Sequence, residues 1–366
     1  AGSAPAGCAN QPGPIRADGQ FDDWKDVRPI HTDPPGDATG AFDVTRVQVA
    51  GRGTTLFVHF DVPRLINVQK GPEEEGTLIV QVRLGDSREL NLDLRNRKAF
   101  LADSPEQRIP WADLGFVITP THASDRFELR CELGGLGVEP GETVAVQLAG
   151  SDSLDSPVTL ALSEPPNPPI RRLPDRLGLD DIRVVSLNTW LDGLADPKRE
   201  DSLRRLLEFA DGDIYCFQEE RKSETDKLAN RMAELLGGQP PGVLLRRGDW
   251  VIATRWKLTA VPADGPHYAA AVVHTPAAGP LLVMSIHPDA GGYIGDRRDR
   301  KRVLQMRQIV RTIERFRAGT LGLELRRYRN APIVVVGDYN LVGSREPMNM
   351  LEAPGVELTH WKLRNL

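Results

Sequence analysis

The sequence predicts two domains, an all-β sandwich followed by an α/β domain, and three observations support this. The chain has 366 residues, which is long for a single domain. Residues 163–178, SEPPNPPIRRLPDRLG, contain five prolines and favour an extended linker between residues 1–162 and 179–366. Before this segment the pattern predicts short strands only, and after it strands alternate with helices.

Composition excludes several classes of protein. Hydrophobic residues make up 40% and charged residues 27% of the chain, which excludes a collagen, a disordered tail and a disulfide-dense scaffold. No apolar run approaches the ~18–20 residues that cross a bilayer. The three cysteines show no metal-ligand spacing, and Cys216 lies in the apolar run IYCF and is predicted to be buried. The opening AGSAPAGCAN is typical of the flank of a cleaved secretory signal, so a secreted, periplasmic or cell-envelope location is expected.

The two halves differ in charge. Residues 1–175 hold 17 Lys and Arg against 26 Asp and Glu, whereas residues 176–366 hold 29 against 25. The second half therefore tolerates anionic partners better, although its small positive excess argues against strong non-specific binding to duplex DNA.

The first half contains seven runs that alternate apolar and polar residues between Gly, Pro and Asp. No amphipathic helix interrupts them, so a β-sandwich is predicted. The runs are VTRVQVA (44–50), TLFVHFD (55–61), TLIVQVRL (77–84), RELNLDLR (88–95), GFVITP (115–120), RFELRCEL (126–133) and TVAVQLA (143–149).

In the second half, six strand-like runs are separated by helical patterns. Asp196-Pro197 predicts a helix start, a second helix carries Leu228, Met232 and Leu235, and a third begins near Asp299. The strand-like runs are IRVVSL (182–187), DIYCF (213–217), WVIA (250–253), AAAVVH (269–274), LLVMSI (281–286) and PIVVV (332–336).

Polar residues follow four of these apolar strands. A polar group just beyond a strand is held rigidly at the edge of the sheet. Carboxylate oxygens bind Mg²⁺, amides and imidazoles donate to phosphoryl oxygens, and an aspartate can orient an attacking water. The strand-end residues are Asn188, Glu219, His287, Asp338 and Asn340.

Each of these residues also has a purely structural interpretation. Asn188 could end a strand, and His287 could be a structural hydrogen-bonding group. Glu219 could be a solvated strand end, since Glu220 follows it and could be equally exposed. Asp338 and Asn340 could close an ordinary turn. The combination of all five favours chemistry over structure alone.

The ordered motifs SLNTW (186–190), FQEE (217–220), ATRW (253–256), SIHPDAGG (285–292) and VVVGDYN (334–340) resemble the endonuclease/exonuclease/phosphatase superfamily. This resemblance implies a four-layer α/β sandwich of the deoxyribonuclease I type and a Mg²⁺-dependent phosphoesterase, with Mn²⁺ as a substitute metal. It implies Glu219 as the metal ligand, with Asn188 beside it. It also implies that Asp338 orients the water and that His287 and Asn340 bind phosphoryl oxygens. Arg255 and Arg298 lie where such proteins bind substrate.

The family pattern continues with a strand and Asp-His well after the GDxN motif. Here 28 residues follow Asp338, and His360 has neither a preceding aspartate nor an apolar strand, so it is given no role. We expect that the last strands of the pattern are missing from this chain and that a sheet edge is exposed where they would pair. A degenerate family member is the alternative.

The segment IRADGQFDDWKDVRPI (15–30) resembles the start of family 9-like carbohydrate-binding modules. This resemblance implies a glycan-binding sandwich, in which Trp24 and Trp111 are either stacking platforms or core residues. The acidic loops at Asp33 to Asp37 and at Glu73, Glu74 and Glu75 either hold Ca²⁺ or are simply solvated.

Together these patterns predict a phosphoesterase that hydrolyses a phosphodiester or phosphomonoester by in-line attack of metal-activated water. Nucleic acid, a phospholipid headgroup and a sugar phosphate remain open as substrates. Removing residues 1–165 is expected to leave turnover intact. The alternative is a non-catalytic glycan- or surface-binding protein. Neither G-x-S-x-G nor G-x-G-x-x-G occurs, which disfavours a serine hydrolase and a dinucleotide enzyme.

Overall fold

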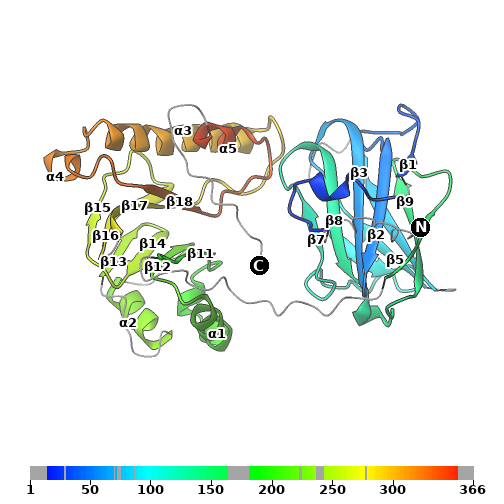
Figure 1. Ribbon diagram of the computed structural model, residues 1–366, viewed down its shortest axis with the longest axis horizontal. Helices are drawn as coiled ribbons and strands as arrows, with labels where there is room; N and C mark the ends of the chain where they lie inside the picture. The colour runs from blue at the N-terminus through cyan, green and yellow to red at the C-terminus, as the bar shows by residue number, and fades with distance from the viewer. Residues whose placement is uncertain are drawn as a thin grey trace, which may run out of the picture.

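In the computed structural model the chain forms four β-sheets and few helices, with two sheets in each half (Figure 1). The structure describes residues 15–28, 30–69, 71, 76–85, 88–163, 181–221, 225–235, 243–276 and 278–352. Several predicted features lie outside these residues, namely most of the proline-rich segment, the opening residues with Cys8, the Glu73, Glu74 and Glu75 run, and His360.

Alternating residues in the first half produce two antiparallel five-stranded sheets. The spatial orders are β1-β2-β3-β8-β7 and β10-β9-β4-β5-β6. The strands are β1 (Ile30–Thr32), β2 (Arg46–Arg52), β3 (Thr55–Ile66), β4 (Leu78–Leu84), β5 (Arg88–Asp93), β6 (Lys98–Leu101), β7 (Val117–Thr119), β8 (Ser124–Glu132), β9 (Thr143–Gly150) and β10 (Val158–Ala161). Short 3₁₀ turns lie at Asp22–Trp24 and Gly134–Leu136.

The inward faces of these two sheets share one hydrophobic core. Along β4, Leu78, Val80 and Val82 are buried and alternate with partly exposed residues, as a strand with one face in the core requires. Phe60 of β3 and Phe127 of β8 are fully buried and stack with ring centroids 5.4 Å apart. Each such side chain contributes roughly 1.5–3 kcal/mol to stability through burial.

The second half forms two mixed four-stranded sheets, β11-β12-β14-β13 and β15-β16-β17-β18. The pairs β11–β12 and β17–β18 are parallel, and the other pairs are antiparallel. Among the described strands, β11 and β18 lie at sheet edges. The strands are β11 (Val184–Asn188), β12 (Ile214–Gln218), β13 (Val243–Arg247), β14 (Trp250–Thr254), β15 (Leu258–Ala260), β16 (Tyr268–Thr275), β17 (Gly279–Ile286) and β18 (Ile333–Gly337).

Helices cover the outer faces of these two sheets (Figure 1). Strand β12 is buried along its whole length, because Tyr215 and Phe217 pack with α1 and α2 while Ile214 and Cys216 pack toward the other sheet. The helices are α1 (Glu200–Ala210), α2 (Thr225–Leu235), α3 (Arg297–Arg317), α4 (Leu323–Arg326) and α5 (Glu346–Leu351), with 3₁₀ turns at Gly193–Ala195 and Pro197–Arg199. Among the described helices, none is both long and apolar enough to cross a membrane.

The predicted strands and the three predicted helices are all present, but five short strands were not predicted. Strands β1, β6 and β15 have three or four residues, too few to show a period, and β10 is equally short. Strand β13, VLLRR, does not alternate. Asp196 caps the 3₁₀ turn Pro197–Arg199, where its side chain accepts from the backbone N–H of Lys198, whereas the α-helix that the sequence predicted from this point begins at Glu200.

The sandwich contacts the α/β half through specific hydrogen bonds. The side chain of Asn67 donates to the carbonyl of Val342 (2.8 Å) and accepts from the N–H of Ile294 (2.7 Å). The N–H of Ala123 donates to the carbonyl of Gly343 (2.7 Å). Both partner segments belong to loops that lead away from the predicted site residues, so the first half contacts the framework of that site.

Candidate functional site

The carboxyl ends of two parallel strand pairs lie at the same edge of the two sheets. Asn188 ends β11 in register with Gln218 of β12, and Ile286 of β17 is in register with Gly337 of β18. Residues that follow these strands therefore come together although they are far apart in the sequence. Gly337 permits this at β18, because it has φ 145° and a Cβ there would lie 2.0 Å from the carbonyl oxygen of Ile286.

Four of the predicted site residues form one cluster. The side-chain amide of Asn188 donates to Glu219 Oε1 (3.0 Å) and to Asp338 Oδ2 (3.1 Å). His287 Nε2 lies 3.7 Å from the same Glu219 oxygen and 3.8 Å from the same Asp338 oxygen. The two carboxylates are thus held toward each other by one amide and face one imidazole.

Asn340 lies beside this cluster rather than in it. Its backbone N–H donates to Asp338 Oδ1 (3.0 Å), and its side-chain amide donates to the carbonyl of Pro288 (2.9 Å). The first bond fixes the rotamer of Asp338, and the second joins the β18 loop to the segment after His287. One N–H of the Asn340 amide is used in this way, so the second is available to an additional acceptor.

The backbone around Glu219 is strained. Glu219 has φ 70°, and Trp190, Leu191 and Asp192 are three consecutive left-handed residues with φ 52°, 56° and 62°. The N–H of Leu191 donates to Glu219 Oε2 (3.0 Å), so this loop wraps the carboxylate. Such outliers concentrate at functional sites because ordinary folding does not favour them.

This strained loop also exposes two large apolar side chains at the site. Trp190 is 66% exposed and Leu191 56% exposed. The Arg199 guanidinium lies over the Trp190 ring, 5.1 Å from its centroid, and donates to the carbonyls of Thr189 and Trp190. No pattern in the sequence indicated Trp190 as a site residue. Trp190 lies two residues beyond Asn188, but this position indicates a role at the site only when the geometry of the site is known.

Buried polar groups support the cluster from below. Glu220 is fully buried, contrary to the interpretation that it could be as exposed as Glu219. It accepts from the Thr189 hydroxyl and from the N–H of Leu194 (3.0 Å), and burial raises its pKa. Gln218 is also fully buried and donates to Ser285 Oγ (2.9 Å), which joins β12 to β17 across the two sheets.

Asp299 at the start of α3 holds together the two loops that leave the site. Its Oδ1 accepts from the N–H of Ser344 (2.8 Å), and its Oδ2 accepts from the N–H of Gly295 (2.9 Å). Asn67 of the sandwich bridges neighbouring residues of the same two loops. These loops are therefore fixed both from within the α/β half and from the sandwich.

The structure does not bring Arg255 to this cluster, which corrects its prediction as a substrate-binding residue. Arg255 follows β14 and pairs with Asp213 (2.7 Å), which precedes β12. Glu219 follows the opposite end of the five-residue strand β12, roughly 13 Å or more away at ~3.3 Å per residue. The antiparallel pairing of β12 with β14 sends Arg255 to the far edge of the sheet.

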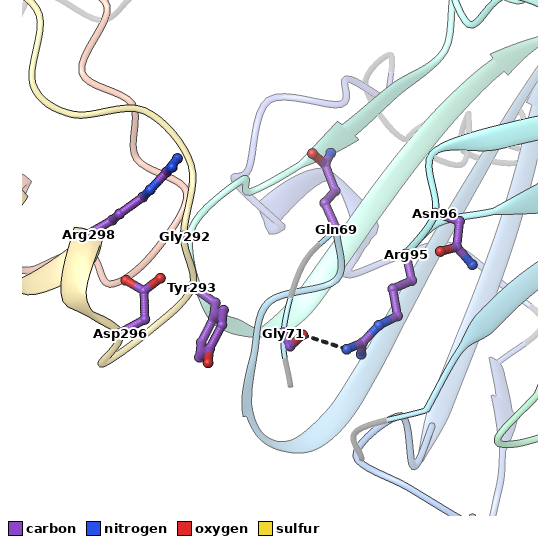
Figure 2. A pocket seen from close by; sticks show the side chains of 8 residues that line it. All are labelled: Gln69, Gly71, Arg95, Asn96, Gly292, Tyr293, Asp296 and Arg298. Atoms are coloured by element: carbon purple, nitrogen blue, oxygen red, sulfur yellow. Dashed lines mark hydrogen bonds between the residues drawn. The ribbon is translucent and has the colours of Figure 1, made fainter. Parts of the chain in front are cut away.

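Arg298 lies in a cleft between the two halves (Figure 2). The cleft has a volume of about 470 Å³, and Tyr293, Asp296 and Arg298 line one side. Gln69, Arg95 and Asn96 of the sandwich line the other side. Arg298 donates to the carbonyl of Ala290 (3.0 Å), which keeps its guanidinium near the loop that follows His287.

Trp24 is not a stacking platform. It is 1% exposed, its indole N–H donates to Glu128 Oε2 (2.7 Å), and its ring stacks on His59. The interpretation as a core residue is confirmed for Trp24. Trp111 is partly buried against the sandwich core beside Phe116, with ring centroids 4.3 Å apart.

The donor set of the cluster fits a hard divalent cation. Glu219 and Asp338 supply oxygen ligands, and their side chains are 14% and 38% exposed, respectively. Within the described part of the chain, no Lys or Arg forms an ion pair with either carboxylate, so their negative charge has only His287 opposite it. Oxygen ligands with uncompensated charge are what Mg²⁺ and Mn²⁺ require.

No protein-family model matches the chain. No curated protein matches it. Among solved structures, it is similar to an endonuclease/exonuclease/phosphatase family protein from Bacteroides thetaiotaomicron, at 17% identity and a TM-score of 0.29. The match covers 43% of this chain and 63% of that one, and at this TM-score it does not establish a common fold.

Proposed function

We propose that this chain is a metal-dependent phosphoesterase with a deoxyribonuclease I-like second half, hydrolysing a phosphodiester or phosphomonoester by in-line attack of water. One observation carries the proposal. The amide of Asn188 binds Glu219 and Asp338 at once, opposite His287, at the shared edge of two sheets. A cluster of this kind, with two carboxylates and no paired Lys or Arg in the described residues, supports cation and phosphate binding better than a structural role.

Glu219 would hold Mg²⁺ or Mn²⁺, with Asp338 beside it. When bound, such a cation polarises the phosphoryl oxygens and neutralises the charge that develops on them. The Leu191 N–H holds the second oxygen of Glu219, so the carboxylate presents Oε1 toward Asp338 and His287. This arrangement fixes the ligand before substrate arrives.

The remaining residues bind the phosphate and the water. Asp338 accepts a hydrogen bond from the attacking water and orients it, because the N–H of Asn340 already fixes its other oxygen. His287 Nε2 and the free N–H of Asn340 donate to phosphoryl oxygens. Asn188 uses its side-chain N–H groups on the two carboxylates, so in this arrangement it positions them.

Arg298 would bind an anionic part of the substrate that extends from the site into the cleft between the two halves. Arg298 lines that cleft at the start of α3, and its guanidinium donates to the carbonyl of Ala290 in the loop that follows His287. Nucleic acid, a phospholipid headgroup and a sugar phosphate all carry such a group. Secretion, and glycan binding by the sandwich, are further proposals from the sequence, and the burial of Trp24 removes one glycan platform.

The test compares Glu219→Gln and Asp338→Asn with wild type on bis-p-nitrophenyl phosphate, p-nitrophenyl phosphate and plasmid DNA in the presence of Mg²⁺. Each substitution keeps the shape of the side chain and removes its charge, so each should lower kcat/KM at least ~100-fold. Glu208→Gln on the exposed face of α1 is the matched control and should retain activity. Retention of more than about a tenth of wild-type activity by both site variants would contradict the proposal.

The alternative, a non-catalytic binding protein with a degenerate phosphoesterase-like half, makes a different prediction. Wild type would then turn over none of these substrates, although calorimetry would still detect Mg²⁺ at Glu219.

A further inference from the structure

A second group of carboxylates lies in the sandwich, away from the proposed active site. Asp33 follows β1, Asp37 lies in the loop between β1 and β2, and Asp152 follows β9. One oxygen from each of these three side chains lies within 4.8 Å of the other two. The acidic composition of the Asp33–Asp37 loop is visible in the sequence, but Asp152 is more than a hundred residues away and was not expected beside it.

One buried oxygen in this group has no partner. Asp33 is 6% exposed, and its Oδ2 is inaccessible to solvent and accepts no hydrogen bond. A buried carboxylate oxygen without a donor is costly, so native proteins satisfy such atoms with a hydrogen bond or a cation. The orphaned oxygen of Asp33 therefore points to a ligand that the protein alone does not supply.

The surrounding groups add negative charge and do not offset it. Asp43 lies nearby, with Oδ2 accepting from the N–H of Gly36 (2.9 Å) and Oδ1 buried without a partner. Among the described residues, no Lys or Arg forms an ion pair with Asp33, Asp37 or Asp152.

The chemistry of the ligands favours one cation. Ca²⁺ takes about 6–8 oxygen ligands in a flexible geometry, and three carboxylate oxygens within 4.8 Å of one another can bind one such ion together. Mg²⁺ needs a tighter octahedron and keeps most of its waters, and Zn²⁺ prefers nitrogen and sulfur ligands. A group made only of carboxylates, two of them nearly buried, fits Ca²⁺ best.

We propose that Asp33, Asp37 and Asp152 form a Ca²⁺ site that joins the two sheets of the sandwich. Asp33 and Asp37 belong to the β1–β2 connection of one sheet, and Asp152 belongs to the exit of β9 in the other. Hydrogen bonds already link the two segments, because Asp152 Oδ2 accepts from the N–H of Val44 (2.6 Å) and the N–H of Thr39 donates to Ser151 (2.8 Å). The ion neutralises the carboxylates and completes this link.

Substitution of Asp37 gives the most direct test of the calcium site. It is exposed, and its side chain makes no hydrogen bond among those of the described residues, so Asp37→Asn removes a ligand charge with little effect on folding. The full chain, treated with chelator and dialysed, is melted with CaCl₂, with MgCl₂ and with neither. Calcium binding is measured in parallel by calorimetry.

Calcium at about 100 times its Kd should raise the Tm of the wild-type sandwich by roughly 5–10 °C, and magnesium at the same concentration should raise it far less. Asp37→Asn should weaken calcium binding at least ~10-fold and keep the wild-type Tm in chelator. Glu219→Gln should retain the full calcium shift, which separates this site from the proposed active site. Asp103→Asn, an exposed aspartate of the same sandwich, is the matched control.

Three results would overturn the proposal. The first is a wild-type Tm that does not respond to calcium. The second is an Asp37→Asn variant that binds calcium as tightly as Asp103→Asn. The third is a calcium shift that Glu219→Gln removes, which would place the ion at the other cluster.

Discussion

At the scale of single residues, the protein contains buried ionisable groups whose pKa depends on both burial and hydrogen-bond partners. Glu128 on β8 is fully buried beneath the N-terminal segment. Its Oε1 accepts from the backbone N–H groups of Asp18 (2.8 Å) and Gly19 (2.6 Å), and its Oε2 accepts from the Trp24 indole. These donors favour the ionised form, but burial dominates and raises the pKa of Glu128 to about 7.

This raised pKa predicts how stability depends on pH. An unfolded glutamate titrates near ~4.3, so between that pH and about 7 the folded chain binds more protons than the unfolded chain. The contribution of Glu128 to the free energy of unfolding is therefore greatest at low pH and decreases as pH rises through this window. The Glu128→Gln variant lacks this dependence. Relative to wild type, it should gain roughly 3 kcal/mol as pH rises from ~4.5 to ~7.

The measurement is urea unfolding of both proteins at several pH values across that window. Glu106→Gln, an exposed glutamate of the same half, is the control. A constant difference between Glu128→Gln and wild type at all pH values would show that folding does not raise the pKa of Glu128.

At the scale of elements, the strand-end pattern predicted the core of the candidate site, because a strand ends where its apolar run ends. Asn188 is the last residue of β11, and Glu219, His287 and Asp338 follow β12, β17 and β18. The four residues meet at one edge. The backbone conformation of the loop Thr189–Asp192 could not be predicted in this way, since nothing in SLNTWLD specifies three consecutive left-handed residues. The same limit applied to Arg255, whose location depends on β14 running antiparallel to β12.

That loop gives a prediction about the class of substrate. Trp190 is 66% exposed beside Asn188, so a nucleobase next to the bound phosphate could stack on its ring. Trp190→Ala should raise the inhibition constant of a single-stranded oligonucleotide roughly tenfold and leave that of inorganic phosphate unchanged. Both constants are measured against bis-p-nitrophenyl phosphate hydrolysis.

Leu323→Ala, which removes an 88% exposed side chain from α4, is the control for the loss of an exposed apolar side chain. Equal oligonucleotide inhibition of Trp190→Ala and Leu323→Ala would argue against a nucleic-acid substrate that stacks at this loop.

At the scale of the whole molecule, the two halves are not independent, which changes the expectation that removing residues 1–165 leaves turnover intact. Asn67 holds the loop after His287 and the loop after Asp338 at the same time, through Ile294 and Val342. Contacts between residues more than 220 positions apart carry no local sequence signal. The sequence therefore predicted the architecture of each half but not their contact.

We expect Asn67→Ala to lower kcat roughly tenfold, because displacement of the two loops misplaces His287 and Asp338. Asn91→Ala, which removes a similarly buried asparagine from the opposite sheet of the sandwich, is the matched control and should lower stability but not kcat. The two variants are compared in kcat, KM and Tm.

Equal kcat for Asn67→Ala and Asn91→Ala would show that the sandwich does not position the site.

Arg298→Gln should behave differently from Asn67→Ala, raising KM for substrates with a second anionic group while kcat is unchanged.

The hydrogen bond between Gln218 and Ser285 has a consequence for the mechanical behaviour of the site. Asn188 and Glu219 are carried by one sheet and His287 and Asp338 by the other, so any sliding of one sheet over the other would pull the two half-sites apart. Packed apolar faces resist separation but are tolerant of small lateral shear. The buried side-chain amide of Gln218, next to Glu219 in the sequence, joins the two sheets at Ser285 and opposes that shear, so it helps to hold the spacing of the four side chains.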